Sequence, residues 1–298
     1  MPIRPTLSRH AAALALVAAL LPLSAHATYQ LTATSNARTV SFLPAPGGTD
    51  TDAQNLNFFN QPGATTLQRL DSFATADHGN ATARFQGRIG LLKAYAESNY
   101  ARCCIEGTTV LLGGANATVQ GSFYDEVLVG GDGLAVGTPV SYQLVLRLSG
   151  TVSNPSFESG ANLYAVAMAE ARLRDSSSGQ EVSLKWDAAE QATGLYTLTL
   201  ATAVGHTLSI QGMLFADTHV EAGAVIGRHA EVDFYHSAGY NLAPSVAGLN
   251  TIGASGTDFL APVPEPATTL LWCSGLAALA VLGGRRSPLT LAAPAQER

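Results

Sequence analysis

Apolar and polar residues alternate along most of this chain, in short segments separated by glycine, asparagine, aspartate, serine and proline. The clearest cases are the even positions of 142–148 and the odd positions of 163–173, which carry leucine, alanine or tyrosine. Shorter runs of strand character cover 195–200, 208–215 and 232–234. A period of two is typical of strands with one buried face. The pattern predicts an all-β sandwich, jelly-roll-like, for the middle of the chain.

Turn signals divide these segments at short intervals, at Gly113-Gly114, at 130–133 and at 175–179. No linker or internal repeat splits the body, so one domain is expected over residues 28–262. Its first part, Thr28 to His78, is less regular, and is either an irregular portion of the sandwich or a mobile arm. Residues 187–193 fit a single helical turn.

The N-terminus has the layout of a secretory signal peptide. Arg4 and Arg9 precede an apolar run at 11–21, and Ala25 and Ala27 supply the small residues of a signal-peptidase site. We expect a signal helix within residues 1–27 and export of the rest. A buried N-terminal helix is the alternative interpretation.

The C-terminus carries a second apolar segment. After a proline-rich stretch, residues 267–284 contain no charge, and Arg285-Arg286 follow. Eighteen helical residues span roughly 27 Å, enough for a short transmembrane helix. The arginine pair places residues 287–298 in the cytoplasm, so the body would lie outside the inner membrane. A buried core helix is again the alternative.

The order of these C-terminal features resembles the PEP-CTERM sorting signal of Gram-negative bacteria. The residues that carry the resemblance lie within 263–286 and are Val263, Pro264, Glu265, Pro266, Arg285 and Arg286. The resemblance implies recognition by an exosortase, a membrane enzyme that would remove the helix near Pro264-Glu265-Pro266. It also implies a bacterium that makes exopolysaccharide and biofilm. The tail after Arg286 is longer than is usual in this group.

Three segments of the body, 90–96, 123–126 and 232–234, are similar to β-rich ectodomains common among PEP-CTERM proteins. That resemblance implies a fold and brings no activity with it.

Composition narrows the classes of function. The 298 residues have a formal charge of −6, with 13% charged and 47% hydrophobic residues. Without the two terminal segments the body keeps 11 basic and 20 acidic residues, a charge of −9. This balance disfavours a nucleic-acid partner and argues against a disordered chain.

Cys103-Cys104 is the most unusual local feature. In an oxidising compartment the pair could form a vicinal disulfide, bond to another chain, remain as thiols or take a metal or redox role. Cys273 falls in the expected membrane helix.

Histidines beside acids are the candidates for metal binding. On a regular strand His229 shares a face with Glu231 and Asp233, while His236 faces the other side. His219 likewise shares a face with Asp217 and Glu221. Zinc needs three or four converging ligands, so we expect solvated strand residues, no metal and no cofactor.

Two aspartate-containing segments are candidates for calcium loops. Asp50 and Asp52 alternate as calcium ligands do, but the glycine and glutamate of an EF-hand are missing. Asp132, between glycines, fits a simple turn.

No catalytic motif emerges. The segment Gly253-Ala254-Ser255-Gly256 lacks the spacing of a nucleophile elbow, and Asp125 and Glu126 are adjacent and so face opposite sides of a strand. Trp186 is the single tryptophan of the body.

The sequence therefore predicts a non-catalytic exported protein. It would pass through an inner-membrane-anchored intermediate to the cell surface or extracellular matrix, in association with exopolysaccharide. One alternative is a carbohydrate-binding or carbohydrate-active protein on the same sandwich. Another is a permanently membrane-anchored envelope protein.

Overall fold

The computed structural model describes residues 29–42, 49–58, 66–76, 78–100, 113–153, 163–221 and 228–260. The chain divides into two units, Met1–Ala261 and Pro262–Arg298, and all described residues belong to the first.

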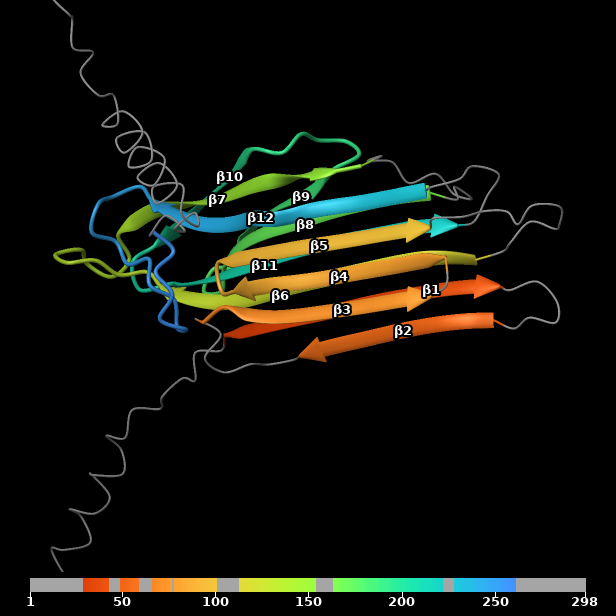
Figure 1. Cartoon of the computed structure of the whole chain (residues 1–298). Helices are drawn as coiled ribbons and strands as arrows, with labels where there is room; N and C mark the ends of the chain where they lie inside the picture. The colour runs from red at the N-terminus through yellow and green to blue at the C-terminus, as the bar shows by residue number, and fades with distance from the viewer. Residues whose placement is uncertain are drawn as a thin grey trace, which may run out of the picture. The chain divides into compact units, whose positions relative to one another are not determined.

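The described residues form β-strands and no helix (Figure 1). The strands are β1 (Gln30–Phe42), β2 (Thr49–Phe58), β3 (Gln68–Ala76), β4 (Gly79–Arg88), β5 (Leu91–Tyr100), β6 (Gly113–Leu128), β7 (Pro139–Val152), β8 (Leu163–Asp175), β9 (Glu181–Asp187), β10 (Leu195–Ala203), β11 (Thr207–Glu221) and β12 (Arg228–Pro244). The all-β class is thus confirmed for this part of the chain. The two expected terminal helices lie outside it.

The strands form two six-stranded antiparallel sheets, which lie as two layers in Figure 1. The first sheet has the order β2-β1-β6-β11-β8-β9 and the second the order β10-β7-β12-β5-β4-β3. From β5 to β8 the chain changes sheet at every connection. Strands β5 to β12 therefore make two four-stranded layers, β5-β12-β7-β10 and β6-β11-β8-β9, in the order of a jelly roll. The pairs β1-β2 and β3-β4 extend these layers.

The alternation in the sequence matches the buried face of each sheet. On β7 the side chains of Tyr142, Leu144, Leu146 and Leu148 are buried, and on β8 the odd positions from 165 to 173 are. Their even-numbered neighbours on β8 are partly or fully exposed. Antiparallel sheets with one face on the core and one in water produce this pattern.

The segment from Thr28 to His78 contains three strands, β1, β2 and β3, and is therefore part of the sandwich where it is described. On β2, Asp52 Oδ2 accepts a hydrogen bond from the Thr75 backbone N–H at 2.9 Å, and Gln54 bonds the backbone of Phe73 at 2.8 Å. These contacts join the edge strands of the two sheets. The idea of a mobile arm fails for these strands.

The core combines small residues with large aromatic ones. Buried alanines line much of β8, and the Trp186 ring meets Phe234 at 5.4 Å between centroids. Glycines provide further space: a Cβ on Gly121 would lie 2.0 Å from the Phe85 ring. Small residues opposite rings let the layers interdigitate at native density.

Buried hydroxyl pairs connect the sheets through this apolar core. Ser35 donates to Ser72 Oγ at 2.9 Å, and Ser98 and Thr218 are joined at 2.8 Å. Each pair joins a residue of one sheet to a residue of the other sheet. Because a buried hydroxyl without a partner is costly, these pairs favour one alignment of the two layers.

Two local features depart from regular strands. In β12 the register shifts between Phe234 and Ala238, and His236, within this bulge, is exposed, as expected for a solvated strand residue. After β9, the Gln191 N–H donates to the Asp187 carbonyl at 2.9 Å, which is the single turn expected there.

Candidate functional site

The residues that the sequence assigned to processing lie outside the described part of the structure. They are Ala25, Ala27, Val263, Pro264, Glu265, Pro266, Arg285 and Arg286, together with the cysteines Cys103 and Cys104. Their roles stay predictions. Among the described residues, none forms a helix with the length and apolar character that crossing a membrane requires.

A hollow of about 400 Å³ lies on the first sheet, mainly on its outer face. A volume of this size is typical of small-molecule binding sites, which range from about 300 to 1,000 Å³. The residues that line it are Gln30, Gln120, Ser122, Phe123, Tyr124, Glu170, Arg172, Gln211, Gly212 and Met213.

Cross-strand pairing places the polar lining of the hollow in rows. Gln30 on β1 is the partner of Tyr124 on β6, Tyr124 of Gln211 on β11, and Gln211 of Arg172 on β8. The next row contains Ser122, Met213 and Glu170 in the same order of strands. Four neighbouring strands thus present side chains to one place, although residues 30 and 211 are far apart in the chain.

The charged groups of the hollow neutralise one another. Arg172 Nη2 lies 3.1 Å from Glu170 Oε1, and Arg172 Nε lies 3.4 Å from Glu181 Oε1. The buried Nε atom makes no hydrogen bond of acceptable geometry within the described residues. Tyr124 donates its hydroxyl to Glu126. The lining is therefore polar but carries little net charge.

The base of the hollow is held from the core side. Tyr240 on β12 is buried, and its hydroxyl donates to the carbonyls of Met213 at 2.8 Å and Glu170 at 3.1 Å. Burial raises the pKa of Tyr240 above its usual range, so the hydroxyl stays a donor. Gly212 leaves room for this ring, because a Cβ there would lie 2.7 Å from it.

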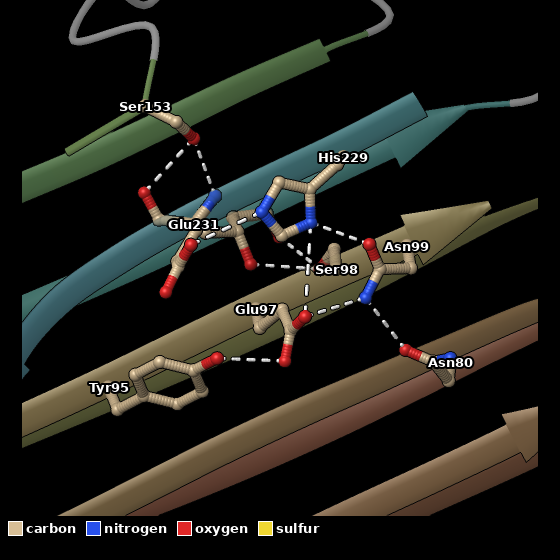
Figure 2. Close-up of polar contacts among 9 residues, drawn as sticks. Asn80, Tyr95, Glu97, Ser98, Asn99, Ser153, His229 and Glu231 are labelled. Atoms are coloured by element: carbon tan, nitrogen blue, oxygen red, sulfur yellow. Dashed lines mark hydrogen bonds and ion pairs between the residues drawn. The ribbon is translucent and has the colours of Figure 1, made fainter. Parts of the chain in front are cut away.

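A second polar group, the His229 cluster, lies on the outer face of the second sheet (Figure 2). It consists of Asn80, Tyr95, Glu97, Asn99, His229 and Glu231, from β4, β5 and β12. His229 Nε2 lies 3.2 Å from Glu231 Oε2, and its Nδ1 contacts Asn99 and lies 3.8 Å from Glu97. The expected shared face of His229 and Glu231 is observed.

Every carboxylate oxygen of Glu97 in this cluster has a partner. Tyr95 donates to Oε2 at 2.8 Å and Asn99 to Oε1 at 2.8 Å, while Asn99 also donates to Asn80 at 3.0 Å. Burial, then the bond to Glu97, raises the pKa of Tyr95 above its usual range. The groups of this cluster satisfy one another.

Next to the cluster, cations lie over aromatic rings. The Arg84 guanidinium is 5.3 Å from the Phe73 ring and 5.6 Å from the Tyr95 ring, and Lys93 Nζ is 5.8 Å from the Tyr235 ring. Burial lowers the pKa of Lys93. Partly or fully exposed aromatic rings therefore lie near acids on this face, but the rings are engaged with cations of the protein itself.

Asp175, at the end of β8, is a buried carboxylate that the sequence did not single out. It accepts hydrogen bonds from Thr202 Oγ1 at 2.8 Å, from the Ser177 N–H at 2.8 Å and from His206 Nδ1 at 2.7 Å. Burial by itself would raise the pKa of Asp175, but the bonds from His206, Ser178 and Thr202 outweigh it and hold the pKa well below its usual range. This carboxylate organises a turn.

Asp125 is the second buried carboxylate. Its side chain accepts from Ser255 Oγ at 2.6 Å and from the Glu126 N–H at 2.9 Å, which ties residues 253–257 to β6. Burial raises the pKa of Asp125 against the lowering effect of these bonds. Glu126 is partly exposed, so the expected opposite orientation of the two acids is observed. Ser255 thus holds its loop against β6.

The remaining candidates occupy structural positions. His219 shares a face with Glu221, 3.2 Å away, and stacks on Tyr164 at 5.2 Å. Asp52 lies on a strand and not in a loop, and Asp132 lies in a turn, as expected. Within the described residues, no group of three or more His, Cys, Asp or Glu side chains is arranged to hold a metal ion.

The hollow is the feature that sequence reasoning missed. Gln30, Tyr124 and Gln211 are ordinary polar positions in segments where polar and apolar residues alternate. No motif in the neighbouring sequence distinguishes them. One signal was present: Met213 has the opposite parity to Ile210, so one of them had to face outward.

Comparison with known families identifies the C-terminal segment. Residues 262–287 match the PEP-CTERM protein-sorting motif, which confirms the resemblance found in the sequence. The match contains all six residues assigned to sorting. No curated protein matches the chain.

One solved structure shows a distant likeness. It belongs to work on the promiscuous specificity of carbohydrate-binding modules from the β-sandwich superfamily. The identity is 10%, over 72% of this chain and 85% of that one, with a TM-score of 0.15. A likeness at this level carries no argument about the present protein.

Proposed function

We propose, on the premise that this chain carries a PEP-CTERM protein-sorting motif, that it is a non-catalytic exported protein sorted by an exosortase. The single observation behind this proposal is the motif at 262–287. The body would then reach the cell surface or the extracellular matrix and function there in association with exopolysaccharide.

A non-catalytic role agrees with how the buried acids are used. Asp175 and Asp125 each accept hydrogen bonds from backbone N–H groups in turns and loops. Such bonds occupy lone pairs that a general base or nucleophile would use. Trp186 is buried and donates to the Ala192 carbonyl at 2.9 Å, so it does not form a surface platform.

The test is the intact mass of the protein in each cell fraction of its own host. We expect a released species that begins near Thr28 and ends in the region of Pro264-Glu265-Pro266. A membrane-bound species that ends at Arg298 would overturn the exosortase assignment and support the permanently anchored alternative.

A pair of variants sharpens this test. Replacement of Pro264, Glu265 and Pro266 by alanine should keep the protein in the membrane fraction at its uncleaved mass. The control Arg298→Ala changes a residue outside the matched motif and should be released as the parent is. Release of both variants would show that the motif does not direct processing.

A matched gene deletion tests the association with exopolysaccharide. Cells without this protein should retain less exopolysaccharide in their matrix, and restoring the parent gene should reverse the loss. Unchanged biofilm and matrix composition would contradict this part of the proposal.

A further inference from the structure

The hollow on the first sheet offers hydrogen-bonding groups that the protein itself leaves available. Within the described residues, the side-chain amides of Gln30 and Gln211 make no hydrogen bond, and Gln120 contacts only Met213 Sδ, at 3.7 Å. An amide both donates and accepts. Three amides around one depression therefore match a ligand with many hydroxyl groups, each of which also donates and accepts.

The lining also contains surface for the apolar face of such a ligand. The Tyr124 ring and the Met213 thioether stand between the amides, on β6 and β11. Sugar rings present C–H groups on their faces and hydroxyls at their edges. A site with an aromatic side chain surrounded by amides suits both parts of a sugar ring.

The lining is long enough to contact several units of a chain. The row Gln30, Tyr124, Gln211 and Arg172 crosses four strands, which are about 4.8 Å apart, so the row extends over roughly 14 Å. Consecutive sugar units of a polymer could contact successive members of this row.

The charge of the hollow and of the body indicates which class of polysaccharide would bind. Among the described residues that line the hollow, the one cation, Arg172, is already paired with Glu170 and Glu181. The body carries a formal charge of −9, which repels polyanions at long range. These two facts favour an uncharged polymer over an acidic one.

The base of the hollow is fixed before any ligand arrives. Tyr240 bonds the carbonyls of Met213 and Glu170, which are direct cross-strand partners. Residues on strands that are held in this way lose little freedom on binding.

We infer that the hollow lined by Gln30, Gln120, Tyr124, Gln211 and Met213 is a binding site for an uncharged exopolysaccharide chain. The inference rests on the proposed function in one respect, namely that export brings the body to the polymer. It names the class of polymer and the residues that bind it.

The test uses the exported protein purified from its own cells. Exopolysaccharide from the same cells is separated by anion exchange, and the neutral and acidic fractions are cast into separate native gels. We expect retardation in the neutral fraction. The Tyr124→Ala and Gln211→Ala variants should bind about tenfold or more weakly, as expected when a contact worth one or two hydrogen bonds is removed.

The matched control is Gln143→Ala, which removes an exposed glutamine from the outer face of the other sheet and should bind as the parent does. Thermal unfolding of every variant checks its fold, and Gln30→Ala serves if Tyr124→Ala is unstable. The inference is overturned by no retardation in the neutral fraction, by retardation in the acidic fraction alone, or by equal binding of Gln211→Ala and Gln143→Ala.

Failure of this inference is distinguishable from failure of the proposed function. A released protein that binds neither polysaccharide fraction would support sorting and would contradict the proposed binding site. An uncleaved membrane-bound protein contradicts sorting, whatever the gels show.

Discussion

On the outer face of the second sheet, Glu97 uses both carboxylate oxygens for contacts with Tyr95 and Asn99, and His229 lies between Asn99 and Glu231. On the outer face of the first sheet, the amides of Gln30 and Gln211 make no side-chain hydrogen bond to the described residues. The two faces belong to the same sandwich and both are polar. Pairing of the polar groups with one another, and not polarity itself, therefore separates a self-contained surface from one that is available to a ligand.

A hydrogen bond between the two sheets should matter most for stability. Asp175 ends β8 in the first sheet and accepts from Thr202 on β10 in the second. Asp175→Ala should lower the free energy of unfolding by about 3 kcal/mol, because it removes the buried acceptor of hydrogen bonds from Thr202, His206 and the Ser177 backbone N–H. Urea unfolding at neutral pH measures this loss. If Thr202→Ala alone lowers the free energy of unfolding by the same amount, the effect belongs to the Thr202 hydroxyl and not to the carboxylate.

Acid should reproduce part of that loss in the parent protein. The folded pKa of Asp175 lies below that of an unfolded aspartate, so its contribution is present above about pH 4 and disappears as the pH falls toward the folded value. Stability measured from pH 6 downward should fall less steeply in Asp175→Asn. Parallel curves for parent and variant would contradict this account.

Next in size is a change beneath the hollow. A Cβ on Gly212 would lie 2.3 Å from the Phe123 ring and 2.7 Å from the Tyr240 ring. Gly212→Ala should cost about 2 kcal/mol of stability by overpacking, and should weaken glycan binding because Tyr240 can no longer hold both carbonyls. Gly130→Ala, where a Cβ meets nothing within 4 Å, is the control. A neutral Gly212→Ala would mean that the base of the hollow adapts.

A smaller effect is expected in the His229 cluster. Glu97 and Glu231 are direct cross-strand partners, and His229 contacts both. His229→Ala should cost about 0.5–1 kcal/mol, because it leaves two acids opposite each other on an exposed face. The loss should shrink in high salt, and Glu97→Gln in the same chain should recover it. A loss independent of salt would contradict the electrostatic reason.

The smallest effect on stability is expected in the hollow itself. Gln30→Ala and Gln211→Ala should stay within about 0.5 kcal/mol of the parent, since these side-chain amides make no hydrogen bond to the described residues. Thermal unfolding checks this. A clear loss of stability in either variant would show that these amides support the fold, and would contradict the stated difference between the two faces.

Much of the fold could be predicted from the sequence because strand patterning is local. The alternation at 142–148 and 163–173 reports which side chains are buried, and the structure buries them. The bulge in β12 could not be predicted, because it depends on how β12 pairs with β5 and β7. His236 is exposed for that reason.

The candidate sites divide in the same way. His229 with Glu231, and His219 with Glu221, are two residues apart, so the period of a strand brings each pair to one face. Asp175 and His206 are 31 residues apart and meet only because β10 returns the chain to the end of β8. No spacing in the sequence predicts such a pair.

The class of the fold, the position of the sorting motif and the acidic charge of the body could all be read from the order and kinds of amino acids. These properties depend on the order of residues over short stretches or on composition alone. Which polar residues are paired, and which line a hollow, depends on the folded arrangement of the strands. A cross-strand row such as Gln30, Tyr124 and Gln211 exists only after sheet pairing joins distant segments in one register.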